Sequence, residues 1–196
     1  DPHHGWGDSH RQWNDGANDG FGTANGTDGR RVFGYLTEED IPFYWDLYST
    51  FAMSDHHHCS VLGPTWVNRW YMTSGTSFGK VENVPPPAAR MATTPNSIFQ
   101  QLDAAGIDWR IFYTDVSFAL GGYTGYAFTR LNRQILPITQ FQRYLDEGTL
   151  PPVVFLDPSF AHGVEQTDEH PPSDMQFGQA WVRQVVRRRA NCCSRC

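Results

Sequence analysis

A hydroxyl residue, Thr65, directly follows Gly63 and Pro64 and precedes a stretch with helical character, residues 66–73. The glycine and the proline impose a sharp turn, after which a helix is predicted to begin. The first turn of a helix presents unpaired backbone N–H groups and the positive end of the helix dipole, which together favour a bound anion. A phosphate group therefore suits this position, next to a hydroxyl.

A hydroxyl is a weak nucleophile at neutral pH, so Thr65 would need a general base or a metal to attack phosphorus. Arg69 lies one helical turn later and could direct its guanidinium toward the same anion. The alternative is that Thr65 only caps the helix and that Arg69 is a solvated surface charge. From the residues alone, capping is the commoner role of a hydroxyl at this place.

The segments around this turn resemble the central motif of the bacterial phosphoesterase family that includes phosphocholine-specific phospholipases C and some acid phosphatases. The matching residues are 40–44, 57–65, Asn68 and Arg69. Further segments match in the same order, at residues 6–20, 102–109, 155–158, 168–172 and 178–179. The resemblance covers the chain as far as Arg187.

The resemblance implies an α/β, alkaline-phosphatase-like fold with a central, mostly parallel sheet flanked by helices. It implies that Thr65 binds a divalent metal ion of unknown identity and attacks the phosphorus of a phospholipid or related phosphate ester, giving a phosphoenzyme that water hydrolyses. It also implies a periplasmic or extracellular location. The other catalytic candidates that it indicates are His10, Asn68, Arg69, Asp168 and His170.

Plainer roles compete with these candidates. His10 could be a hydrogen-bonded packing residue, and Asp168 could be a turn residue. We interpret His56, His57 and His58 mainly as packing residues, because three consecutive side chains on regular backbone do not all face one ion. For the whole chain, the alternatives are a non-catalytic binding module or pseudoenzyme and, within the family, an acid phosphatase.

Two metal-binding motifs of the family have no counterpart here: an early Glu-Asn-Arg-Ser-Phe-Asp run and a late Asp-Glu-His-Gly-Gly run. We therefore expect residues 1–187 to be part of one domain, with a sheet incomplete at both ends and too few metal ligands for activity. Residues 188–196 are basic and rich in cysteine, and we expect them to be an unstructured tail. A truncated or frame-shifted coding sequence would explain this tail.

The elements that position these residues follow from periodicity and breakers. Residues 1–31 are predicted to be irregular, residues 56–61 to form a short strand or a turn, and residues 80–95 to form a proline-rich loop. The predicted strands are residues 109–113 and 152–156. The predicted helices are residues 37–51 with Thr37 as the cap, 66–73, 96–105, 139–147 and 176–187.

The composition of 14% aromatic and 18% charged residues is that of a folded chain, and 196 residues suit a single domain. The net charge is −6, although the last fourteen residues carry five arginines and no acid. An acidic body repels nucleic acid, so we expect no nucleic-acid partner. No apolar run is long enough to predict a transmembrane segment.

Overall fold

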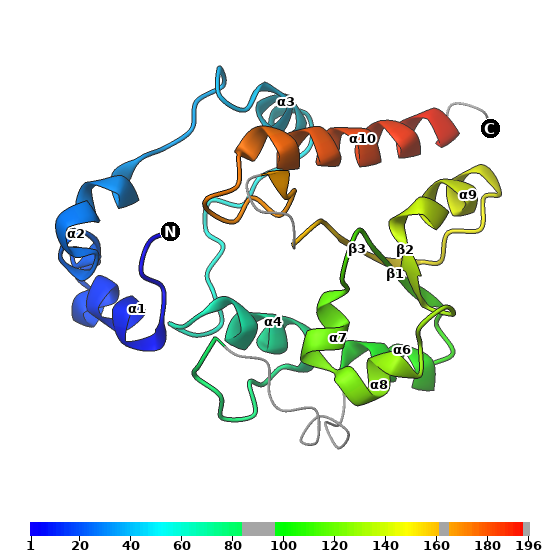
Figure 1. Ribbon diagram of the computed structural model, residues 1–196, viewed down its shortest axis with the longest axis horizontal. Helices are drawn as coiled ribbons and strands as arrows, with labels where there is room; N and C mark the ends of the chain where they lie inside the picture. The colour runs from blue at the N-terminus through cyan, green and yellow to red at the C-terminus, as the bar shows by residue number, and fades with distance from the viewer. Residues whose placement is uncertain (84–96, 161–164, 194–196) are drawn as a thin grey trace. The chain divides into compact units, whose positions relative to one another are not determined.

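The computed structural model describes residues 1–83, 97–160 and 165–193. The chain divides into two units, Asp1–Pro85 and Pro86–Cys196, where the sequence predicts one domain through residue 187. Figure 1 shows the first unit as helices joined by long loops and the second as a small sheet with helices around it. The predicted loop at residues 80–95 lies outside the described residues from residue 84 onward.

A three-stranded parallel sheet forms the centre of the second unit. The strands are β1 (Trp109–Tyr113), β2 (Ile135–Pro137) and β3 (Val153–Asp157), in the order β2-β1-β3. Ile111 of β1 is paired with Ile135 on one side and with Phe155 on the other. The predicted α/β class with a parallel sheet is thus confirmed. β2 was not predicted, because a three-residue strand is too short to show a period.

Side chains of β1 alternate between two packed faces, as the pleat of a strand requires. On one face, the ring of Phe99 lies 4.8 Å from Trp109 and 5.3 Å from Phe155. On the other, Phe112 lies 5.3 Å from Phe141. Figure 1 shows the corresponding helices on either side of the sheet: α6 (Ile98–Ala104), α7 (Phe118–Gly122) and α8 (Thr124–Phe128) opposite α9 (Phe141–Asp146).

The predicted helices at 96–105 and 139–147 are confirmed with shifted ends. α6 begins after Ser97, whose hydroxyl and Gln100 form a capping box. The other helix is a 3-10 turn, η3 (Ile138–Gln140), followed by α9. α7 and α8 lie within residues 114–138, for which no element was predicted.

The last helix, α10 (Met175–Cys193), extends six residues beyond its predicted end at Arg187. Residues 188–193, expected to be an unstructured tail, are therefore helical. No proline or glycine interrupts residues 188–193, and arginine and alanine favour helix. In the described segments of the chain, no helix is both long enough and apolar enough to cross a bilayer.

The first unit corrects the expectation that residues 1–31 are irregular. They form α1 (Trp6–Trp13) and α2 (Phe21–Ala24), with 3-10 turns η1 (Asn14–Gly16) and η2 (Gly26–Phe33). α1 carries an ion pair between Asp8 and Arg11, and it ends at Asn14 in the left-handed conformation, with φ 44°. Asparagine tolerates this conformation, so Asn14 is a helix stop signal within the sequence.

Thr37 does not cap the next helix, contrary to prediction. α3 (Pro42–Thr50) begins with proline at its first turn, a position for which the proline ring is preorganised. Residues 37–40 instead form a separate turn, in which the Thr37 N–H and hydroxyl donate to Asp40 Oδ2 at 2.7 and 2.8 Å. These hydrogen bonds lower the pKa of the Asp40 carboxyl.

Asp103 at the end of α6 connects three elements of the second unit. Its carboxylate accepts hydrogen bonds from Trp109 Nε1 at 2.9 Å, Tyr126 Oη at 2.5 Å and Gln134 Nε2 at 3.0 Å. It also pairs with Arg130 Nη2 at 2.6 Å. Partial burial raises the pKa of Asp103, but the hydrogen bonds from Tyr126, Arg130, Trp109 and Gln134 outweigh it and lower the pKa to about 2.

The depressed pKa of Asp103 predicts an acid-sensitive second unit. Because the folded pKa lies below the unfolded value, this stabilisation is present at neutral pH and is lost between about pH 5 and pH 2. Solvent screens a carboxylate that is 25% exposed, so we expect a loss of about 1–2 kcal/mol in the free energy of unfolding. Urea unfolding at several pH values measures it; an Asp103→Asn variant with the same acid dependence would contradict this assignment.

Candidate functional site

Thr65 is the first residue of the ten-residue helix α4 (Thr65–Ser74), which confirms the helix predicted at 66–73. The N-cap is Pro64, which is buried and has extended backbone with ψ 175°. Thr65 is therefore not the N-cap, and the alternative that it only caps the helix is wrong. Its exposed side chain belongs to the first turn, whose backbone N–H groups have no acceptor within the helix.

One of these N–H groups is engaged by a side chain. The Trp66 N–H donates to Asn83 Oδ1 at 3.1 Å, so an amide oxygen lies where an anion would bind. A phosphate oxygen at this N–H would have to replace the exposed Asn83 side chain. Arg69, half-buried, follows one turn later on the same helix.

Asn68 directs its side-chain amide at the turn before Thr65. Its Oδ1 accepts from the Val61 N–H at 3.2 Å. Its Nδ2 donates to the carbonyl oxygens of Val61, Gly63 and Pro64 at 3.2, 3.0 and 3.3 Å. Both polar atoms of this catalytic candidate thus contact the backbone of residues 61–64.

His10 lies on α1, which contacts the same turn. Its ring is 4.5 Å from the Trp6 ring, and Trp6 packs against Gly63, with Cε3 3.2 Å from where a Cβ would be. The His10 Nδ1 lies 2.8 Å from the Trp6 carbonyl oxygen. Because a carbonyl only accepts, Nδ1 carries a hydrogen, and in the neutral ring Nε2 is the basic nitrogen.

The contact between Trp6 and Gly63 predicts that Gly63→Ala is destabilising. The added methyl group would press on the ring, which is 38% exposed and is able to shift, so we expect a loss of about 1 kcal/mol and a change in tryptophan fluorescence. Gly7→Ala is the control, because a Cβ there meets nothing within 4 Å and α1 gains helix propensity. Equal urea midpoints for the two variants would show that the turn tolerates the methyl group.

Asp168 and His170 lie in the second unit, where they form one turn. Asp168 Oδ1 accepts from the His170 N–H at 3.1 Å and from the Ser173 hydroxyl at 3.3 Å. The His170 Nδ1 lies 2.7 Å from the Pro171 carbonyl oxygen, to which it donates. The hydrogen bonds of Asp168 agree with the alternative that it is a turn residue.

Two acids at the carboxyl edge of the parallel sheet accept hydrogen bonds from neighbouring segments of the second unit. One of them, Asp115, was not among the predicted site residues. Asp115 follows β1, and its Oδ2 accepts from the Ser159 hydroxyl at 2.9 Å and from the Phe160 N–H at 2.8 Å. Asp157, buried at the end of β3, accepts from the Phe118 N–H at 3.1 Å. Acids at or just after the carboxyl ends of two neighbouring parallel strands are a sequence signal for this edge.

A cavity of about 420 Å³ opens in the second unit. Thr114 and Ile138, which follow β1 and β2, line it together with Trp181 and Arg188 of α10. The carboxyl edge of an open parallel sheet is a common place for ligands.

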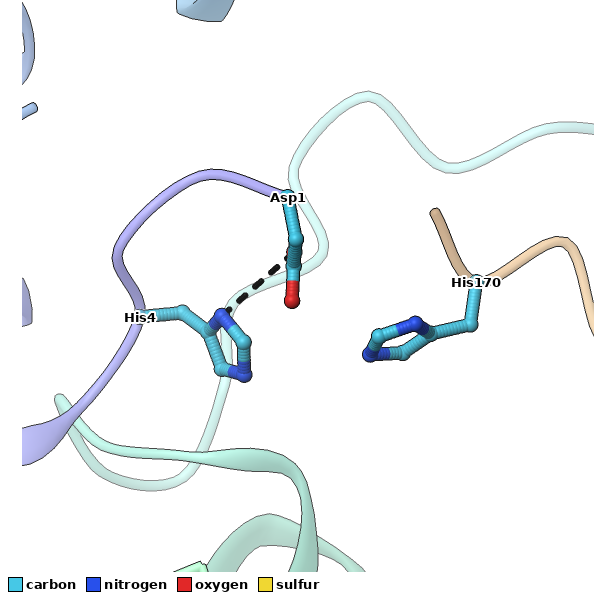
Figure 2. Close-up of side chains that lie close together, drawn as sticks. All are labelled: Asp1, His4 and His170. Atoms are coloured by element: carbon cyan, nitrogen blue, oxygen red, sulfur yellow. Dashed lines mark ion pairs between the residues drawn. The ribbon is translucent and has the colours of Figure 1, made fainter. Parts of the chain in front are cut away.

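The structure does not support packing as the role of the three consecutive histidines. His56, His57 and His58 are all exposed, and His56 Nε2 lies 3.7 Å from Asp55 Oδ1. In the first unit, His4 Nδ1 also lies 3.6 Å from Asp1 Oδ1, as Figure 2 shows; His170, drawn there too, belongs to the second unit. Among the described residues, neither unit by itself brings together three His, Cys, Asp or Glu side chains at metal-binding distances.

The chain matches one family and several phospholipases. A model of the family described as "Phosphoesterase family" matches residues 1–191. The non-hemolytic phospholipase C of Burkholderia pseudomallei strain K96243 is 32% identical, over 94% of this chain and 30% of the relative. The non-specific phospholipase C6 of Arabidopsis thaliana is 29% identical over 75% of this chain and 28% of the relative. The chain thus spans less than a third of the length of either relative.

Proposed function

This chain belongs to the phosphoesterase family, and on that premise we propose that it cleaves a phosphate ester bond of a phospholipid with the Thr65 hydroxyl as nucleophile. The observation that carries the proposal is the exposed Thr65 at the first turn of α4, where backbone N–H groups favour an anion. The names of the similar phospholipases C support a phospholipid over a simple phosphate ester.

The reaction is a displacement at phosphorus in two steps. Thr65 Oγ1 forms a bond to phosphorus, the bond to the diacylglycerol oxygen breaks, and the hydroxyl proton passes to a base. The departing oxygen takes up a proton to leave as an alcohol. Water then attacks the phosphorylated threonine, which releases the phosphate-containing headgroup and restores the hydroxyl.

Nearby residues of the first unit suit supporting roles. The Nδ1–H bond to the Trp6 carbonyl orients the His10 ring, so Nε2 is the atom that would exchange a proton. Arg69 would pair with phosphate oxygens from the second turn of α4. By the same family analogy, His170 and Asp168 would act on the substrate side, and the protein would act outside the cytoplasm.

A divalent metal ion is part of the proposal, although the described residues of neither unit form a site for it by themselves. Such an ion would polarise a phosphoryl oxygen and favour the deprotonated hydroxyl. Thr65 would supply one ligand, and a divalent ion requires several more. The family match extends over both units, which supports the proposal that residues 1–187 are part of one catalytic domain.

Trapping the phosphorylated threonine tests the proposal. The 196-residue chain would be incubated with phosphatidylcholine and divalent metals. A chimera would be treated in the same way; in it, residues 59–69 of this chain replace the aligned segment of the Burkholderia phospholipase C. After an acid quench, we expect mass spectrometry of the chimera to find a phosphocholine group esterified to Thr65.

The result separates the candidate functions. The role of Thr65 as nucleophile would be refuted if the chimera hydrolysed the substrate without any adduct on Thr65 and if Thr65→Ala left its rate unchanged. Turnover by the chimera but not by the 196-residue chain would agree with the expected inactivity of this chain. Binding of phosphatidylcholine by the chain and loss of turnover in the chimera would favour the non-catalytic binding module. Faster hydrolysis of a phosphate monoester would favour an acid phosphatase.

A further inference from the structure

A single side chain, that of Asn68, holds the turn that places Thr65. It makes four hydrogen bonds to three residues of this turn, Val61, Gly63 and Pro64. Its own backbone N–H also donates to the Pro64 carbonyl oxygen at 3.2 Å, which is the first bond of α4. The turn is therefore bound to the second turn of the helix that follows it.

The chemistry of these contacts is specific to a carboxamide. Nδ2 faces three carbonyl oxygens, which only accept, while Oδ1 faces an N–H, which only donates. Aspartate has the same shape but lacks the donor, and a charged carboxylate oxygen would face three carbonyl oxygens. Leucine has a similar size and would leave all four backbone groups without this partner.

Residues 61–64 hold the backbone that leads into Thr65, whereas the side chain of Thr65 is exposed and is not held by packing. Pro64 is buried and the Trp6 ring covers Gly63, so the backbone before Thr65 is enclosed by packing and by the Asn68 amide. Loss of the amide contacts would let residues 61–64 change conformation while the rest of α4 stays helical. The hydroxyl of Thr65 would then move with the backbone that carries it.

We infer that Asn68 is a positioning residue that holds the Thr65 hydroxyl in place through the backbone of residues 61–64, and that it does not itself touch the phosphate. The inference rests on the proposed role of Thr65 and changes the role of Asn68 from a catalytic candidate to a support of the nucleophile. A displacement of about 1 Å of a reacting group is enough to cost about 10²-fold in rate.

Asn68→Asp in the chimera is the test. At about pH 8 we expect kcat to fall by about 10²-fold, with KM changing much less, because the nucleophile is displaced and the headgroup contacts remain. Toward about pH 5 the introduced carboxyl takes up a proton, regains one donor and restores part of the turn. The ratio of variant to unsubstituted kcat should therefore rise as the pH falls.

Amide hydrogen exchange in the 196-residue chain supplies a readout that needs no activity. The Val61 N–H should exchange faster in Asn68→Leu than in the unsubstituted chain, because it loses its acceptor. Asn25→Asp is the matched control in the same unit: Asn25 is buried, and its amide contacts His3 N–H and the Phe21 carbonyl, away from the turn. It should leave the exchange of the Val61 N–H unchanged.

The outcomes separate this inference from the proposed function. Unchanged kcat in Asn68→Asp, together with loss of activity in Thr65→Ala, overturns the positioning role and leaves the nucleophile intact. A kcat that is lowered by the same factor at every pH in Asn68→Asp also overturns the positioning role. Such a loss would indicate a direct contact with phosphate, which protonation of the introduced carboxyl would not restore. Full activity of Thr65→Ala overturns the proposed function and this inference with it.

Discussion

Thr65→Ala is expected to lower kcat of the chimera by about 10³-fold or more, because no other group replaces the attacking oxygen. Thr65→Ser keeps a hydroxyl at the same place and should retain activity within about tenfold. Since Thr65 is exposed at the first residue of α4, neither change should alter the free energy of unfolding by more than about 0.5 kcal/mol. Initial rates of phosphocholine release and urea unfolding measure the two effects.

The serine variant serves as the control for the geometry of the turn. If Thr65→Ser were as inactive as Thr65→Ala, the hydroxyl would not be the decisive group. If Thr65→Ala also changed the unfolding midpoint strongly, Thr65 would be a structural residue at the start of α4.

Asp103→Ala is expected to cause the largest loss of stability, about 3 kcal/mol in the free energy of unfolding of the second unit. The substitution leaves Arg130 without its ion-pair partner and the indole N–H of the fully buried Trp109 without an acceptor. The Tyr126 hydroxyl loses its partner as well. With that partner gone, the raised pKa of Tyr126, about 12, should fall, because burial and the Asp103 hydrogen bond raise it together.

Asp146→Ala is the matched control on an exposed helix surface. Asp146 accepts one hydrogen bond from Gln142 Nε2 at 2.9 Å, so its removal should cost no more than about 0.5 kcal/mol. Urea unfolding followed by tryptophan fluorescence compares the two variants. Equal midpoints would show that the Asp103 contacts contribute little to stability.

Local sequence patterns determined a large part of the fold. An amphipathic pattern predicted α6, breakers bounded the helices predicted at α4 and α9, alternation predicted β1, and a short apolar run predicted β3, because these signals depend on close neighbours in the sequence. Short-range signals also misplaced the start of α3: Thr37 was predicted to cap this helix, but the helix begins at Pro42. The three-residue β2 carries too few residues for any period, and only its pairing with β1 defines it.

By itself the sequence placed the start of α4 to within one residue, at Trp66 where the structure has Thr65, because Gly63 and Pro64 fix the preceding turn locally. The resemblance in turn predicted that Thr65 acts as a nucleophile. The hydrogen-bond partners of Asn68 and His10 lie within seven residues of each along the chain. Only the tertiary structure decided that Trp6 covers Gly63 and that Tyr126 and Gln134, 23 and 31 positions further along the chain, donate to Asp103. Hydrogen-bond partners that distant have no signature in the spacing of residues, because packing and not sequence separation brings them together.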